Sequence, residues 1–72
     1  MTLYEVKEGD RVRILNITGG HGVKNRLAAI GLFPGAEVKV VKSPPGPVIV
    51  EVAGSRVAIG QGMAKKVEVE RL

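Results

Sequence analysis

Residues 26–35 read Arg26-Leu27-Ala28-Ala29-Ile30-Gly31-Leu32-Phe33-Pro34-Gly35, and this stretch decides the fold. Together with the residues just before it, it places apolar side chains at the i, i+4, i+7 spacing of one helical face, namely Val23, Leu27 and Ile30. Ala28 and Ala29 are good helix formers. A short helix is therefore predicted here, in the only part of the chain with helical periodicity.

The sequence also predicts where this helix ends. Gly31 lies where a helix commonly ends, because glycine adopts the left-handed conformation of the residue after the cap without a side-chain clash. Pro34-Gly35 suits the centre of a tight turn, since proline fixes φ and glycine accepts a positive φ. We expect Leu32 to turn back toward the core and the chain to enter a new strand.

The segment before the helix is predicted to be a strand over residues 11–17. Val12 and Ile14 alternate with arginines, and the apolar phase then slips to Leu15 and Ile17. A strand that changes face midway usually contains a bulge or bends around a barrel corner. Residues 18–22, rich in glycine, are expected to form a flexible loop.

Three further strands are expected after the helix, over residues 37–42, 48–52 and 67–70, with Val38 and Val40 inward in the first of them. Three prolines in residues 43–47 remove backbone donors, so that segment is predicted to be a loop. Residues 60–66 are expected to be a connection with one tight helical turn. Leu3 and Val6 suit a lead-in that covers an end of the core.

A hairpin accounts for the remaining strand. Gly54-Ser55 is predicted to be its two-residue turn, with Ala53 opposite Arg56. This register places four apolar residues on one face: Val50, Val52, Val57 and Ile59. Five short strands and one short helix then predict a small β-barrel, for which SH3-like and OB-like forms are both candidates; the short strands and the aliphatic core favour the SH3-like form.

Composition narrows the function. The chain has 72 residues, which suits one domain, and no cysteine, which excludes disulfides and thiol nucleophiles. Its formal net charge is +4, a bias that suits an acidic protein surface or nucleic acid without deciding between them. The amino end does not resemble a signal peptide, and no apolar run is long enough for a membrane span. A cytoplasmic protein without membrane insertion is expected.

No catalytic or metal-binding set is recognisable. His21 is the only histidine, and nothing in the spacing brings Asp10 or Glu37 to it. No serine, threonine or carboxylate pair has the partners that catalysis needs, so neither an enzyme nor a bound cofactor is expected. The glycines before the helix suit an anion site, yet no Walker A spacing follows, and a mobile connection is the favoured interpretation.

Phe33 is the residue that suggests a protein contact, although an exposed phenylalanine is often incidental. Phe33 lies in a tight turn, where a side chain tends to face solvent, and beside Arg26 and Pro34 it suits an anchor for a partner. Nucleic-acid binding is the alternative, weakened because barrels that bind single strands stack bases on several aromatic residues. This chain has only one other aromatic residue, Tyr4.

The ordered motifs resemble the signature of the FeoA family of ferrous-iron transport accessory proteins. The core of the likeness is Arg26-Leu27, Ile30-Gly31-Leu32 and Pro34-Gly35. The rest covers nearly the whole chain: Leu3 and Gly9 at the opening, residues 38–41, Gly46-Pro47-Val48, the hairpin over 50–59, and Ala64, Val67 and Val69 at the close.

This resemblance implies an SH3-like barrel over residues 1–72 that works in the cytosol with the ferrous-iron permease FeoB, whose cytosolic part includes a GTP-binding domain. The family is associated with transition-metal binding, but this sequence offers no ligand set. The same domain type occurs in DtxR-like metal-dependent repressors, which leaves a repressor-like module as a second alternative. The partner-binding surface is predicted at Lys24, Arg26, Phe33 and Pro34, and the oligomeric state is left open.

Overall fold

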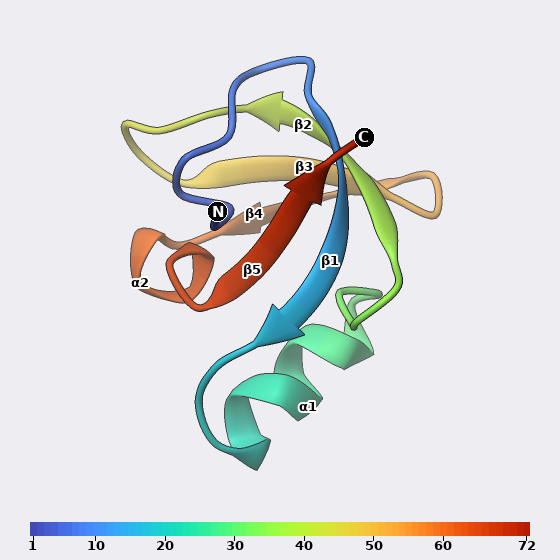
Figure 1. The fold of residues 1–72 in the computed structure, drawn as a ribbon, viewed down its shortest axis with the longest axis vertical. Coiled ribbons are helices and arrows are strands. Elements are labelled where there is room, and N and C mark those ends of the chain that lie inside the picture. The colour runs from blue at the N-terminus through green and yellow to red at the C-terminus, as the bar shows by residue number, and fades with distance from the viewer.

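A computed structural model describes all 72 residues. It contains five strands and two helices in the chain order β1 (Arg11–Ile17), α1 (His21–Ala29), β2 (Glu37–Lys42), β3 (Val48–Val52), β4 (Ser55–Ile59), α2 (Gln61–Ala64) and β5 (Val67–Arg71). The strands form one antiparallel sheet in the order β4-β3-β2-β1-β5. The sheet curls into a partly open barrel, and α1 projects at one end of its long axis (Figure 1).

The two edges of the sheet differ. The outer edge of β5 is covered by the first residues of the chain: Thr2 bridges to Glu68, and the backbone N–H of Leu3 donates to the carbonyl of Val67 at 3.0 Å. β4 has no such cover, and it is not paired with β5. The predicted five strands and mainly β class are confirmed.

The predicted bulge in the first strand is present, but one of its side chains faces the other way. The pairing of β1 with β5 shifts register between Ile14 and Asn16, at Leu15. Ile17 is buried as expected, whereas Leu15 is 48% exposed, so its expected place on the apolar face was wrong. The bulge inserts Leu15 as the extra, unpaired residue and so restores Ile17 to the core side.

The hairpin exists, but its predicted register was wrong. Val52 pairs with Ser55, so the two turn residues are Ala53 and Gly54, both at positive φ (50° and 80°). This pairs all five residues of β3 with all five of β4 and sets Glu51 opposite Arg56, at 3.6 Å between carboxylate and guanidinium. Val52 was expected opposite Val57 and lies opposite Ser55, a shift of two residues, so the inward face of the hairpin is still the predicted one.

The core is aliphatic throughout, and no polar or charged residue is buried. Leu3 and Val6 close one end of it, as expected from the sequence. Its sixteen members are Leu3, Val6, Val12, Ile14, Ile17, Leu27, Leu32, Val38, Val40, Val48, Val50, Val52, Ile59, Ala64, Val67 and Val69. Neither helix has the length and apolar character required to cross a membrane.

Candidate functional site

The helix of the decisive stretch ends in a Schellman motif. The N–H of Gly31 donates to the carbonyl of Ala28 at 3.0 Å, and the N–H of Leu32 donates to that of Leu27 at 2.9 Å. Gly31 has a φ of 91°, as predicted for the residue after the cap. Leu27 and Leu32 are both buried, which supplies the apolar contact that accompanies this motif.

α1 makes few buried contacts beyond its C-terminal end. Leu27 is its only buried residue, and no side chain caps its first turn. Ile30 was expected on the apolar face, but it follows the last helical residue and is 41% exposed. The loop predicted over residues 18–22 is shorter, because the helix already begins at His21. Leu27, the partly buried Val23 and the helix end therefore fix the position of α1.

The turn after the helix is fastened to β1. The N–H of Ala36 donates to the carbonyl of Phe33 at 3.0 Å, and Gly35 has a φ of 95°, which suits a type II turn with Pro34 and Gly35 at its centre. The N–H of Gly35 donates to the carbonyl of Ile14 at 2.8 Å. Since the bulge of β1 follows Ile14 directly, the turn is held beside the end of that strand.

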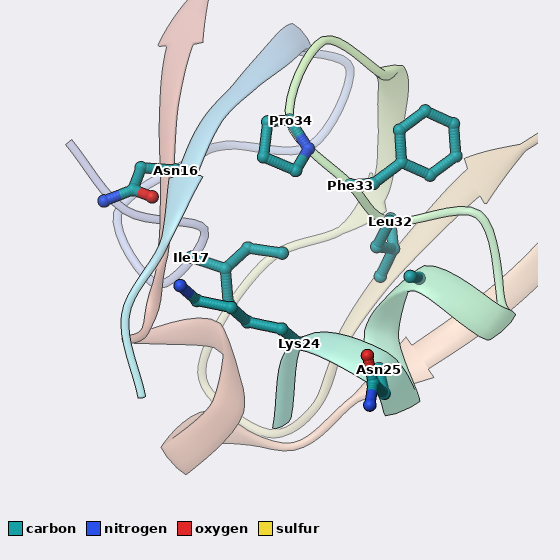
Figure 2. Close-up of a pocket in the computed structure, with 8 residues that line it drawn as sticks. Asn16, Ile17, Lys24, Asn25, Leu32, Phe33 and Pro34 are labelled. Atoms are coloured by element: carbon teal, nitrogen blue, oxygen red, sulfur yellow. The ribbon is translucent and has the colours of Figure 1, made fainter. Parts of the chain in front are cut away.

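A groove of about 200 Å³ lies where α1, the end of β1 and this turn meet (Figure 2). Buried Leu32 and Ile17 form its apolar base. Lys24 extends from α1 toward the end of β1, and the rings of Phe33 and Pro34 belong to the turn on the opposite side. The eight lining residues are Asn16, Ile17, Lys24, Asn25, Ala28, Leu32, Phe33 and Pro34.

The groove has an apolar anchor at its edge, and the helix beside it has positive charge. Phe33 is 49% exposed. Lys24 and Arg26 are exposed, α1 contains no acidic residue, and the four ion pairs of the structure involve only Arg13, Arg56 and Arg71 as cations. The charges on α1 therefore have no carboxylate partner within the chain, and a partner's acidic residues can approach them.

Three of the four predicted site residues come together at the groove: Lys24, Phe33 and Pro34. Arg26 does not line it. The sequence did not indicate the other residues that line the groove. Among them, Asn16 and Ile17 belong to β1, and Asn25 and Ala28 belong to α1. The bulge was the available signal, because it marks the point where β1 turns its edge toward a neighbouring element.

One arginine on the sheet forms two ion pairs. Arg13 on β1 donates to Glu37 on β2 at 3.2 Å and to Glu70 on β5 at 3.1 Å. Its side-chain hydrogen bond to Glu37, followed by that to Glu70, raises the pKa of Arg13 above its ordinary value. All three side chains are about half exposed, so this network joins three strands at the surface. No group of three or more His, Cys, Asp or Glu is arranged to hold a metal ion.

Comparison with known proteins identifies the family of this chain. The sequence model of the FeoA domain matches residues 1–71. The chain belongs to the FeoA family. A relative from Methanocaldococcus jannaschii, named Fe(2+) transport protein A, is 42% identical over 64 residues, which are 89% of this chain and 78% of the relative.

Solved structures agree with this assignment. A crystal structure of an iron uptake regulatory protein, FeoA, is 44% identical with a TM-score of 0.94, and the match covers 100% of this chain and 97% of that one. FeoA of Stenotrophomonas maltophilia, solved with zinc and described as a procaryotic SH3 domain protein, is 30% identical with a TM-score of 0.84, over 97% and 89% of the two chains. The fold is SH3-like, and the family's role is that of an accessory in ferrous-iron transport.

Proposed function

We propose that this protein is a cytosolic regulatory module of ferrous-iron uptake, which binds the GTP-binding domain of a FeoB-type permease through the groove between α1, β1 and the 33–35 turn. The observation that carries the proposal is the groove itself. It combines an apolar base, a half-exposed Phe33 and an unpaired Lys24 in one place. A partner side chain inserted there would pack on the apolar base and bury the exposed part of Phe33.

The chemistry of the groove favours a protein partner. Aromatic residues in a central, desolvated position dominate the binding energy of protein interfaces. Phe33 has only two rotatable side-chain bonds, so ordering it on binding costs little entropy. Positive charge from Lys24 and Arg26 would steer an acidic surface toward the groove and raise the association rate. Arg26 lies outside the groove, and we place it at the rim of the same contact.

The test is a titration of the ¹⁵N-labelled protein with the soluble GTP-binding domain of the permease, followed by amide chemical shifts with and without Fe(II). Shifts should cluster on the α1 residues that line the groove and on residues 32–35. Phe33→Ala should weaken binding by roughly 30-fold or more, the effect expected of an interface anchor worth about 2 kcal/mol. Leu72→Ala is the matched control, because Leu72 is also exposed but lies at the C-terminus.

The charge contribution has its own pair of variants. Arg26→Glu should slow association and weaken binding at low salt, whereas Lys42→Glu at the end of β2 makes the same charge change elsewhere and should have little effect. Unchanged affinity in both Phe33→Ala and Arg26→Glu would remove this surface from the contact. Salt-sensitive shifts with DNA or RNA, in the absence of any with the GTP-binding domain, would favour the nucleic-acid alternative.

A further inference from the structure

β4 is an open strand edge in a sheet whose other edge is closed. The residues before β1 cover β5, whereas no backbone hydrogen bond joins Ser55–Ile59 to anything except β3. β4 contains no proline, the β3–β4 register has no shift, and Arg56 is its only charged residue. Proteins prevent edge pairing with prolines, bulges and charged side chains on the edge strand. Of these three features, β4 has only a single charged side chain.

The register identifies the free groups. A two-residue turn is closed by a hydrogen-bonded pair, here Val52 and Ser55, and hydrogen-bonded and non-bonded pairs then alternate along the hairpin. Val57 is therefore bonded to β3, while the N–H and C=O groups of Arg56 and Ala58 point away from it. Both residues are exposed. A strand laid beside β4 would find two residues with both backbone groups available.

We propose that β4 is a self-pairing edge, where a second copy of this chain adds its own β4 antiparallel about a two-fold axis at Val57. Arg56 of each copy then faces Ala58 of the other, and the two pairs each exchange both backbone hydrogen bonds. The sheets of the two copies become continuous. The proposal does not depend on the proposed function.

The side chains of β4 suit this register. Val57 is half-buried against the core and would face its own equivalent across the axis, which buries more apolar surface. Arg56 would lie opposite the small side chain of Ala58, so no like charges face each other directly. The guanidinium of Arg56 is already 3.6 Å from the carboxylate of Glu51. Arg56 therefore does not require an acidic partner strand, and the β4 strand of a second copy can supply the backbone partners that Arg56 and Ala58 lack.

The pairing should be weak and should respond to salt in a diagnostic direction. Contact along one five-residue strand buries less than the 1,200 Å² or so typical of stable interfaces, so dissociation near the millimolar range is expected. Each copy has a net charge of +4, and the two repel each other. Added salt screens this repulsion, so it should strengthen the dimer, whereas salt would weaken binding to an acidic segment.

The self-pairing edge and the groove share no residue. A dimer would therefore carry two grooves, and a partner that presents the recognised surface twice would be engaged at two points. Linked contacts of this kind raise avidity without a new interaction, provided that the geometry allows both to form.

The absence of cysteine permits a direct test. Val57→Cys places a thiol on the proposed axis, and mild oxidation at high protein concentration should give a covalent dimer. Ala58→Cys is the control, since it would face Arg56 of the second copy and should cross-link several-fold less. Circular dichroism of each variant checks that the barrel is retained. Equal cross-linking of the two variants would overturn the register.

A second measurement needs no cysteine. Sedimentation equilibrium of the unmodified chain should show a concentration-dependent dimer that strengthens from 50 to 500 mM NaCl. Ala58→Pro removes a donor that the monomer does not use, and it should raise the dissociation constant more than tenfold, whereas Ala58→Ser should leave it nearly unchanged. A monomer at all concentrations, or a dimer that survives Ala58→Pro, would overturn the proposal. Loss of GTP-binding-domain affinity in Ala58→Pro, with no dimer in the parent chain, would instead assign the edge to the partner's strand.

Discussion

Leu27→Ala tests whether one side chain holds α1, and with it a wall of the groove, on the barrel. Leu27 is 1% exposed and is the only buried residue of its helix. Burial of a leucine stabilises by about 1.5–3 kcal/mol, and large-to-alanine changes in cores destabilise by about 2–5 kcal/mol. Since α1 can shift to fill part of the space, we expect about 2–3 kcal/mol, toward the lower end of that range.

That loss is large for so small a protein. At roughly 0.05–0.15 kcal/mol per residue, 72 residues have a total stability of about 4–11 kcal/mol. Urea unfolding followed by circular dichroism should show a lower midpoint with an unchanged slope, and hydrogen exchange should show the amides of α1 losing protection before those of the sheet. Leu15→Ala is the control, because Leu15 is 48% exposed and should lose less than about 1 kcal/mol. A Leu27→Ala loss no greater than that of the control would refute the reasoning.

Two further predictions concern backbone and pH. Gly31→Ala should destabilise the protein by about 1–2 kcal/mol, because Gly31 has a φ of 91° and an added Cβ would lie 3.3 Å from Val52. Gly22→Ala should instead stabilise it by about 0.5–1 kcal/mol, because an added Cβ at Gly22 on α1 meets open space. Urea unfolding measures both changes in the free energy of unfolding. The Thr2 backbone N–H, then its hydroxyl, donate to Glu5 and lower the pKa of Glu5, so this stabilisation is present above the unfolded-state pKa and is lost as pH falls through the folded one. A carboxyl-carbon NMR titration should show Thr2→Ala raising that pKa only part of the way, since the N–H remains; full recovery would contradict this order of causes.

The end of the helix was predictable because its determinants are local. Gly31 and Pro34-Gly35 each require a particular backbone conformation, and the structure places all three as the sequence indicated. Val23, Leu27 and Ile30 show the limit of the same reasoning. The helical periodicity predicted a helix that continues through Ile30. The Schellman motif ends the helix one residue earlier and leaves Ile30 at the surface.

The hairpin register was not predictable from turn preference alone. Gly54-Ser55 is an acceptable turn, and Ala53 at a φ of 50° is strained by about 1–2 kcal/mol. The observed register nevertheless pairs both strands along their full length and brings Glu51 to Arg56. Cross-strand contacts and complete strand pairing outweigh the strain at Ala53. A prediction based only on the residues preferred in turns does not take these cross-strand contacts into account.

The groove shows why a site of this kind is only partly visible in a sequence. Lys24, Phe33 and Pro34 were recognisable one by one, since exposure and charge are properties of single positions. Asn16 joins them through the fold: it follows the bulge of β1, and the 33–35 turn is hydrogen-bonded to Ile14 just before that bulge. One wall is thus part of the barrel, and the other is a helix in which only Leu27 is fully buried, with Val23 partly buried beside it. Because Leu27 is the largest buried anchor of the helix wall, mutations at Leu27 should affect both stability and binding, whereas those at the half-exposed Phe33 should affect binding alone.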